Sequence, residues 1–315
     1  KLFSFLGTEN FYILIFPVVY WCFDTGLGIR LALALLSTSS INCLLKIGIH
    51  LPRPYWVDTR VITYASEPTF GFPSGHSQMA ASVWGMHGFY QRNKWTAWAA
   101  GFMIFMIGIS RLYLGVHFLT DVLGGWLLGF LVLLLINQLD RPVSRWISRT
   151  SPGVLFLYAA IPGILLLLLG IAIQFNLHTW QIPESWVEIS ARSGSLINPT
   201  SLKDLYSSVG TWIGFIAGIC WLRSQESSLG KFRNGGNSKQ KLWRYLIGIA
   251  GILILWSGPG LTFPNDETLA GLAFRLLRYA LIGWWISGLA PFISIRLRMV
   301  NPEKPFDVES NVLAQ

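Results

Sequence analysis

Long runs of apolar residues, separated by short polar stretches, constrain the fold of this chain more than any other feature. The run from Phe156 to Phe175 includes an unbroken leucine stretch, Leu165 to Leu169. Only 12% of the 315 residues are charged and 52% are hydrophobic, whereas about 25% of the residues in a soluble domain are charged. Since about 20 apolar residues cross a bilayer as a helix, the sequence predicts an all-α, polytopic membrane helix bundle.

The apolar runs predict about nine transmembrane helices. The chain also holds 15 Trp and 10 Tyr, whose amphipathic rings collect at the two membrane interfaces. Its three cysteines lie inside apolar segments without paired spacing, which favours buried thiols over disulfides or metal ligands. The expected helices cover residues 10–24, 27–49, 75–91, 95–111, 117–138, 153–175, 205–222, 243–258 and 270–294.

Three short polar clusters interrupt the apolar pattern of the first half of the chain. Ionisable groups at membrane depth are costly, so a set this dense indicates a functional site. The clusters are Lys46 with Arg53-Pro54, then Pro73-Ser74-Gly75-His76, then Ser110-Arg111 with His117 and Asp121.

The positions of the clusters on the expected helices predict that they share one site. Lys46 lies at the end of the second helix, His76 opens the third, Arg111 ends the fourth and His117 opens the fifth. Because successive spans alternate in direction, all of these residues emerge on the same side of the membrane.

The distribution of basic residues predicts which side that is. Cytoplasmic loops of membrane proteins carry the excess of Lys and Arg. The face with the clusters holds, outside them, only Lys1, Arg60, Arg192 and Lys203. We therefore expect the site on the extracytoplasmic face, and the net charge of +9 reflects loops rather than nucleic-acid binding. The basic residues of the opposite face are Arg92, Lys94, Arg141, Arg145, Arg149, Arg223, Lys231, Arg233, Lys239, Lys241, Arg244, Arg296, Arg298 and Lys304.

The cations of the clusters suit a phosphoryl group, whose transfer spreads negative charge over its equatorial oxygens. Lys46, Arg53 and Arg111 supply the opposing charge, and the two arginines offer bidentate geometry. Ser74 is placed to cap the third helix. The free backbone N–H groups at the start of that helix favour a bound anion. Gly75 has no side chain, so the anion and the backbone can approach each other closely.

The two imidazoles and the carboxylate complete a catalytic set. His117 and Asp121 are four residues apart at a helix start, hence within reach of each other. The carboxylate can hold the imidazole in one tautomer while the other ring nitrogen attacks phosphorus. We assign His117 as nucleophile, giving a phosphohistidine, and His76 as the acid that protonates the leaving oxygen and later activates water.

The clusters are also compatible with three other kinds of site. The spacing of His117 and Asp121 also fits a metal site, but three nearby cations and the lack of an acidic motif near the site argue against a divalent ion, so we expect no metal and no cofactor. A vanadate in the same cradle could oxidise halide, although the cradle alone does not select that chemistry. A phosphate-lipid transporter or scramblase would bind at the cations without needing the nucleophile and acid.

The clusters resemble the signature of the type 2 phosphatidic acid phosphatase family, related to vanadium haloperoxidases and class A acid phosphatases. The pattern K-x6-RP, PSGH, SR-x5-H-x3-D is present without departure. The resemblance implies a metal-independent phosphatase with His117 as nucleophile and His76 as acid. It also implies phosphate contacts from Lys46, Arg53, Ser74, Gly75 and Arg111.

The resemblance covers about residues 1–140, which we expect to form the phosphatase core, with 141–315 adding transmembrane helices of unknown role. We expect a lipid phosphate phosphatase in a bacterial-type inner membrane. Its substrates would be phosphatidic acid, phosphatidylglycerophosphate or an isoprenyl diphosphate. Residues 176–204, on the same face as the clusters, either cap the site or only connect helices. Oligomeric state is not readable from the sequence.

Overall fold

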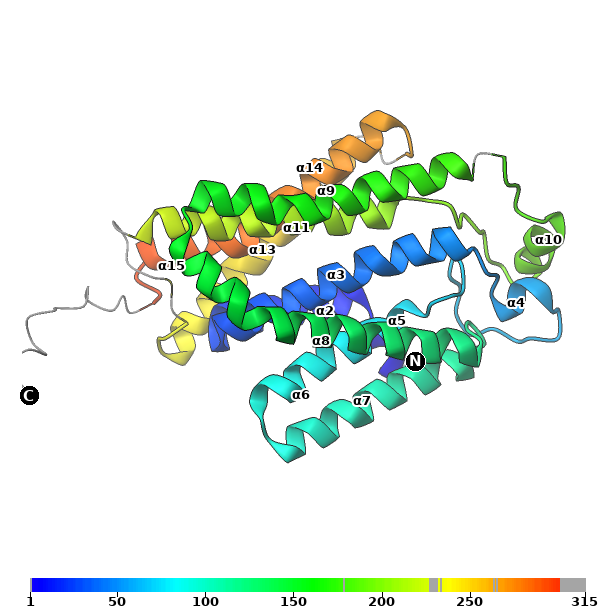
Figure 1. Cartoon of the computed structure of the whole chain (residues 1–315), viewed down its shortest axis with the longest axis horizontal. Helices are drawn as coiled ribbons and strands as arrows, with labels where there is room; N and C mark the ends of the chain where they lie inside the picture. The colour runs from blue at the N-terminus through cyan, green and yellow to red at the C-terminus, as the bar shows by residue number, and fades with distance from the viewer. Residues whose placement is uncertain are drawn as a thin grey trace, which may run out of the picture.

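The computed structural model of the chain describes residues 2–177, 179–226, 232, 234–262, 264 and 266–300, and the described elements are all helical (Figure 1). Three of them, labelled η, are single π-helical segments. The elements are α1 (Leu2–Phe5), α2 (Glu9–Val18), η1 (Val19–Phe23), α3 (Thr25–Ile49), α4 (Pro54–Val57), α5 (Gly75–Met79), η2 (Ala80–Trp84), α6 (Gly85–Gln91), α7 (Lys94–Tyr113), α8 (Leu119–Arg149), α9 (Pro152–Asn176), α10 (Glu184–Arg192), α11 (Lys203–Ser224), α13 (Ser238–Thr262), α14 (Leu269–Trp284), η3 (Trp285–Leu289) and α15 (Ala290–Arg296).

Every helix expected from the apolar runs is present, which confirms the all-α membrane bundle. Within the described residues, six helices are long and apolar enough to cross a membrane, so the expected number of nine spans is not confirmed. The expected helix at 10–24 is short, and the one at 75–91 is interrupted by η2. The six spans are Thr25–Val57, Lys94–Tyr113, Leu119–Arg149, Pro152–Asn176, Lys203–Ser224 and Leu269–Arg296.

The largest boundary difference is at α8, which continues to Arg149 instead of ending near residue 138. Apolarity alone set the expected end, but a helix continues through polar residues until its backbone is interrupted. Here the interruption comes at Ser151-Pro152, where the next helix begins. Lys1, Lys231, Arg233 and Lys304, which entered the charge argument, lie outside the described residues.

The helix ends that carry the three clusters meet at one end of the bundle, as expected. α3 and α7 end there, α5 and α8 begin there, and the short helices α4 and α10 lie at the same end, on the right of Figure 1. The opposite end holds the salt bridge between Arg30 and Asp140, at 2.8 Å.

Glycines of α8 bring its first turns close to α5. A methyl group on Gly125 would lie 2.7 Å from the carbonyl oxygen of Ser74, and one on Gly129 would meet the carbonyl oxygen of Gln78. Small residues four apart permit this close backbone approach. The Ser74 amide also donates to the carbonyl oxygen of Asp121 at 3.0 Å. The second and third clusters are therefore held together by backbone contact.

The C-terminal helices join the bundle through α11, which packs against α3, α9 and α14. On the α3 side, the Ser40 hydroxyl donates to the Ser208 hydroxyl at 2.9 Å. On the α14 side, methyl groups on Gly210 and Gly214 would meet the carbonyl oxygens of Leu276 and Ala280. The small residues of α11 thus place it tightly between the two halves of the chain.

Candidate functional site

A cavity of 190 Å³ opens at the end of the bundle where the clusters meet. Five of the predicted site residues line it, whereas Ser74, Arg111 and Asp121 are not part of the lining. The other lining residues come from α3, the loop before α5, α5 itself, the N-terminal segment, the segment before α11 and the start of α11. The predicted residues on the wall are Lys46, Arg53, Gly75, His76 and His117.

His117 is held between Asp121 and Arg53, and both of its ring nitrogens have partners. Its Nδ1 lies 3.2 Å from Oδ2 of Asp121, and its Nε2 lies 3.1 Å from Nη1 of Arg53. The same Asp121 oxygen accepts from the Phe118 amide at 2.9 Å, which fixes the carboxylate. Because a guanidinium can only donate, Nε2 is the acceptor and Nδ1 carries the proton. This tautomer directs a lone pair from Nε2 towards the cations.

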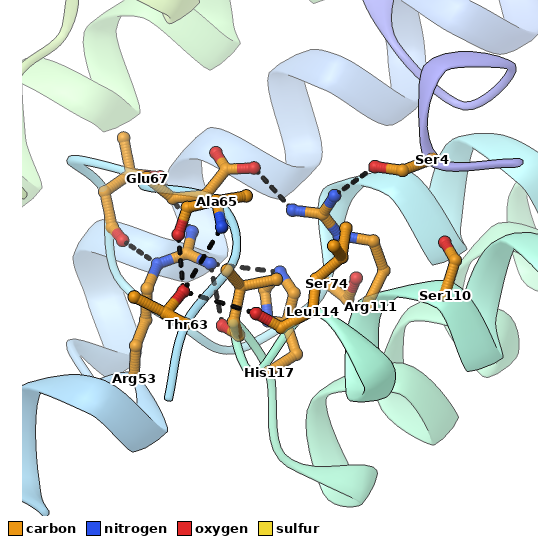
Figure 2. Close-up of polar contacts among 12 residues, drawn as sticks. Ser4, Arg53, Thr63, Ala65, Glu67, Ser74, Ser110, Arg111, Leu114 and His117 are labelled. Atoms are coloured by element: carbon orange, nitrogen blue, oxygen red, sulfur yellow. Dashed lines mark hydrogen bonds and ion pairs between the residues drawn. The ribbon is translucent and has the colours of Figure 1, made fainter. Parts of the chain in front are cut away.

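Arg53 is fully buried, and its guanidinium ties two loops together (Figure 2). Nε donates to the carbonyl oxygen of Thr69 at 2.6 Å, and Nη2 donates to that of Phe70 at 3.1 Å. Nη1 donates to the carbonyl oxygen of Val116 at 3.0 Å as well as to His117. With the Thr69 hydroxyl 3.3 Å from Nη2, all five guanidinium N–H groups are used. Arg53 thus positions the loop before α5 against the segment before α8.

Thr69 is a site residue that the sequence did not reveal. Its hydroxyl accepts from Nζ of Lys46 at 2.8 Å and from Arg53 at 3.3 Å, so it bridges two of the predicted phosphate contacts. It lies in the loop between the first two clusters, and no motif singles it out. Only its contact with both cations identifies it.

Glu67 is a second site residue that the sequence analysis did not identify, because it belongs to no acidic motif. Its carboxylate lines the cavity and accepts from Nη2 of Arg111 at 2.5 Å, while Nη1 of Arg111 donates to the Ser4 hydroxyl at 2.5 Å (Figure 2). Burial raises the pKa of this carboxyl, but Arg53 and Arg111 outweigh burial and lower the pKa to about 2. Glu67 therefore stays ionised and holds Arg111 behind the wall.

The start of α5 follows the expected capping pattern. The Ser74 hydroxyl accepts from the Ser77 amide at 3.5 Å, which confirms the cap but turns the side chain towards its own helix. A methyl group on Gly75 would lie 3.1 Å from Oδ1 of Asn42, so glycine lets α5 approach α3. The backbone of Gly75 and the ring of His76 face the cavity.

The pKa values of both imidazoles lie below the ordinary value of histidine. Burial lowers the pKa of His76 to about 3, and the positive charge of Arg111 acts in the same direction. Burial and the neighbouring Arg53 lower the pKa of His117 well below its usual value. With both imidazoles neutral and Glu67 paired with Arg111, Lys46 and Arg53 are the positively charged side chains on the wall that can contact a bound anion.

The stretch 176–204 caps the site, which decides between the two roles that the sequence left open. Pro199 and Ser201 line the cavity. Trp180 packs against Phe70 with ring centroids 5.8 Å apart, and Trp186 packs against Trp56 at 6.3 Å. The backbone N–H of Asn198 donates to the carbonyl oxygen of Pro68 at 3.0 Å. The cap therefore rests on the same loop that supplies Thr69 and Glu67.

Comparison with known proteins matches two family models to the chain. The PAP2 superfamily model matches residues 27–145, and the model for the transmembrane extension of PAP2 superfamily phosphatases matches residues 206–302. The first match contains all three clusters, and the second covers the described helices from α11 to α15 except the first three residues of α11.

Individual relatives are phosphatases by name. Phosphatidylglycerophosphatase B of Bacillus subtilis is 31% identical over 154 residues, which is 45% of this chain and 73% of the relative. Sphingosine-1-phosphate phosphatase 1 of Mus musculus is 26% identical over 189 residues, 56% of this chain and only 41% of the relative. The crystal structure of a transmembrane PAP2-type phosphatidylglycerolphosphate phosphatase from Bacillus subtilis has 30% sequence identity and a TM-score of 0.39, covering 45% of this chain and 74% of that one. With the three clusters gathered at one cavity and both family models matched, the chain belongs to the PAP2 superfamily of membrane phosphatases.

Proposed function

We propose that this protein hydrolyses a lipid phosphomonoester or diphosphate without a metal, through a phosphohistidine on His117. The substrates named for its relatives, phosphatidylglycerophosphate and sphingosine 1-phosphate, support a lipid substrate. The observation that carries the proposal is the arrangement of His117, with Nδ1 against Asp121 and Nε2 facing Arg53 in a cationic cavity. Charge distribution supports an extracytoplasmic site in a bacterial-type inner membrane.

The first half of the reaction transfers the phosphoryl group to the protein. The incoming phosphate takes over the Arg53 N–H that now points at His117, which frees the Nε2 lone pair for in-line attack on phosphorus. The bond from phosphorus to the leaving oxygen breaks, and the proton of His76 goes to that oxygen. Asp121 stabilises the positive charge that develops on the imidazole ring.

The second half returns the enzyme to its starting state. His76, now neutral, accepts a proton from water as the water oxygen attacks the phosphohistidine. The P–N bond breaks, its electron pair returns to Nε2 of His117, and inorganic phosphate leaves. Lys46, Arg53, Gly75 and the helix start of α5 hold the equatorial oxygens in both halves.

The bound substrate itself prepares His76 for its role. Burial and the nearby cations lower the pKa of His76 to about 3. A phosphate dianion offsets those cations, so its arrival raises the pKa of the ring and allows it to carry the proton for the leaving oxygen. Arg111 and Glu67 together determine how much positive charge around His76 the bound phosphate has to offset.

The decisive experiment measures phosphate release in detergent, with EDTA present, from a panel of lipid phosphates and diphosphates. We expect His117→Ala to lower the rate by at least ~10³-fold because the nucleophile is lost. His87→Ala is the matched control, since His87 lies eleven residues beyond His76 and outside the cavity lining.

The outcomes separate the candidate functions. Hydrolysis of soluble phosphomonoesters alone, with every lipid phosphate ignored, would contradict the lipid assignment. Lipid movement that persists in His117→Ala without phosphate release would favour the transporter or scramblase. Loss of hydrolysis in EDTA, restored by a divalent ion, would contradict the metal-independent mechanism.

A further inference from the structure

Asp204 places a carboxylate on the cavity wall that the proposed phosphoryl transfer does not use. It lies in the first turn of α11, in the part of the chain beyond the three clusters, and it lines the cavity. Unlike His117 and Arg53, which are buried, its side chain is exposed. The carboxylate is therefore open to whatever enters the cavity.

The packing of α11 against α3 determines which turn of α3 lies beside Asp204 at the cavity. The hydrogen bond between Ser40 and Ser208, at 2.9 Å, joins the two helices, which run in opposite directions (Figure 1). One turn before Ser208, Asp204 therefore lies beside the turn of α3 that follows Ser40. That turn contributes Cys43 and Lys46 to the same wall. Asp204 thus lies next to the phosphate cradle and on a different helix from it.

A carboxylate in this place does not bind phosphate, because like charges repel. It accepts hydrogen bonds only, and it does so most strongly from hydroxyl or ammonium donors. The cavity of 190 Å³ far exceeds the ~15 Å³ that one water molecule needs, so it accommodates more of a substrate than its phosphate. Ser39 and Asn42 give the neighbouring wall a polar character. The group that suits this wall is the polar part of the leaving alcohol.

We propose that Asp204 accepts a hydrogen bond from a hydroxyl or ammonium group on the carbon adjacent to the phosphorylated carbon of the substrate. The cavity then selects phosphate esters of alcohols that carry such a donor, and it disfavours esters with an acyl ester or plain hydrocarbon at that carbon. This inference rests on the proposed hydrolysis and names the class of its substrate. The donor can belong to a lysolipid, an amino alcohol lipid or a free polyol phosphate.

The test compares two substrates that differ by one donor, 1-acyl lysophosphatidate with its free 2-hydroxyl and the same molecule with a 2-methoxy group. We expect kcat/KM of the wild-type protein to be about tenfold higher for the hydroxyl substrate, the value of a hydrogen bond to a charged group. Asp204→Asn should lower the ratio towards one by lowering kcat/KM for the hydroxyl substrate, because a neutral amide oxygen accepts a weaker hydrogen bond than a carboxylate. Glycerol 3-phosphate and its 2-methoxy analogue provide the same comparison for a soluble substrate.

Glu188→Gln is the matched control, because Glu188 is an exposed acid of α10 outside the cavity lining, and it should keep the wild-type ratio. A wild-type ratio near one, or a ratio unchanged in Asp204→Asn, overturns the inference while the hydrolase assignment stands. Loss of hydrolysis of both substrates in a folded Asp204→Asn protein, with a wild-type melting temperature, also overturns it, since Asp204 would then serve the reaction itself. If the wild-type protein releases phosphate from neither lipid phosphates nor polyol phosphates, the result contradicts the proposed function itself.

Discussion

At the residue scale, the site depends on charged side chains that are shared between catalysis and structure. Arg53 holds the carbonyl oxygens of Thr69, Phe70 and Val116 while it contacts His117. A lysine could not make this set of contacts, because its ammonium is a point charge without the planar fork of guanidinium. Removal of a fully buried guanidinium would also leave several loop carbonyls without donors. His117, the nucleophile that we propose, is therefore oriented by the same guanidinium that holds the loops together.

Glu67→Gln tests the ion pair between Glu67 and Arg111. We expect the substitution to lower stability on the order of 2 kcal/mol, because it replaces a charged hydrogen bond to the enclosed Arg111 guanidinium by a neutral one. The measurement is the thermal midpoint in detergent at neutral pH. Asp58→Asn is the control, since that carboxylate pairs with the exposed Arg60, and surface pairs contribute little.

The pH dependence of the Glu67→Gln effect follows from the depressed pKa of Glu67. The folded-state pKa of about 2 lies below the ordinary value near 4.3, so the stabilising contribution is complete above the ordinary pKa. It is lost as the pH falls towards 2, where the unfolded and folded states both bind the proton. The difference in thermal midpoint between wild type and Glu67→Gln should therefore shrink below pH ~4.3. A difference that grows on acidification would contradict this assignment.

At the element scale, the described residues of the 176–204 cap and the loop that precedes α5 form one packed layer over the cavity. Tyr55, Trp56 and Phe70 form a buried cluster, and Trp180, Trp186 and Ile197 pack against it. The loop also meets the turn before α8, where the Thr63 hydroxyl donates to the carbonyl oxygen of Leu114 at 3.2 Å (Figure 2). The position of Thr69 and Glu67 thus depends on aromatic contacts from the C-terminal half.

Trp186→Ala should weaken the site through this layer. Loss of the contact with Trp56 loosens the loop that aligns Arg53, so we expect KM for the preferred substrate to rise several-fold and the thermal midpoint to fall. Trp98→Ala is the control, because the Trp98 side chain is 75% exposed on α7. Unchanged kinetics in Trp186→Ala, alongside a lowered midpoint, would restrict the cap to a structural role.

At the scale of the whole molecule, the helix arrangement separates a catalytic end from a basic end. The cavity, α4 and α10 lie at one end of the bundle, and the connections α6–α7 and α8–α9 lie at the other (Figure 1). Arg92, Lys94 and Arg149 belong to those connections. If the basic end is cytoplasmic, the cavity lies where extracytoplasmic headgroup phosphates reside.

Single cysteines at the two ends test this orientation. The native Cys22, Cys43 and Cys220 are buried, so an impermeant maleimide should react slowly with the wild-type protein. We expect Glu188→Cys to be labelled in intact cells and Lys94→Cys to be labelled only after the cells are opened. The reverse pattern would place the site on the cytoplasmic face and contradict the charge argument.

The sequence alone determined the membrane bundle, the helix positions and the gathering of the three clusters, because apolar periodicity and alternating spans are local properties of the chain. Helix ends were less well determined, as α8 shows, since apolarity does not mark where a backbone stops being helical.

Only the tertiary structure decided which residues complete the site. Glu67, Thr69 and Asp204 carry no motif, and each matters because folding places it beside a cation or on the cavity wall. It also decided that Ser74 faces its own helix and that Arg111 stands behind Glu67. Contacts between segments far apart in the chain depend on the packing of α8, α11 and the cap, which no local pattern encodes.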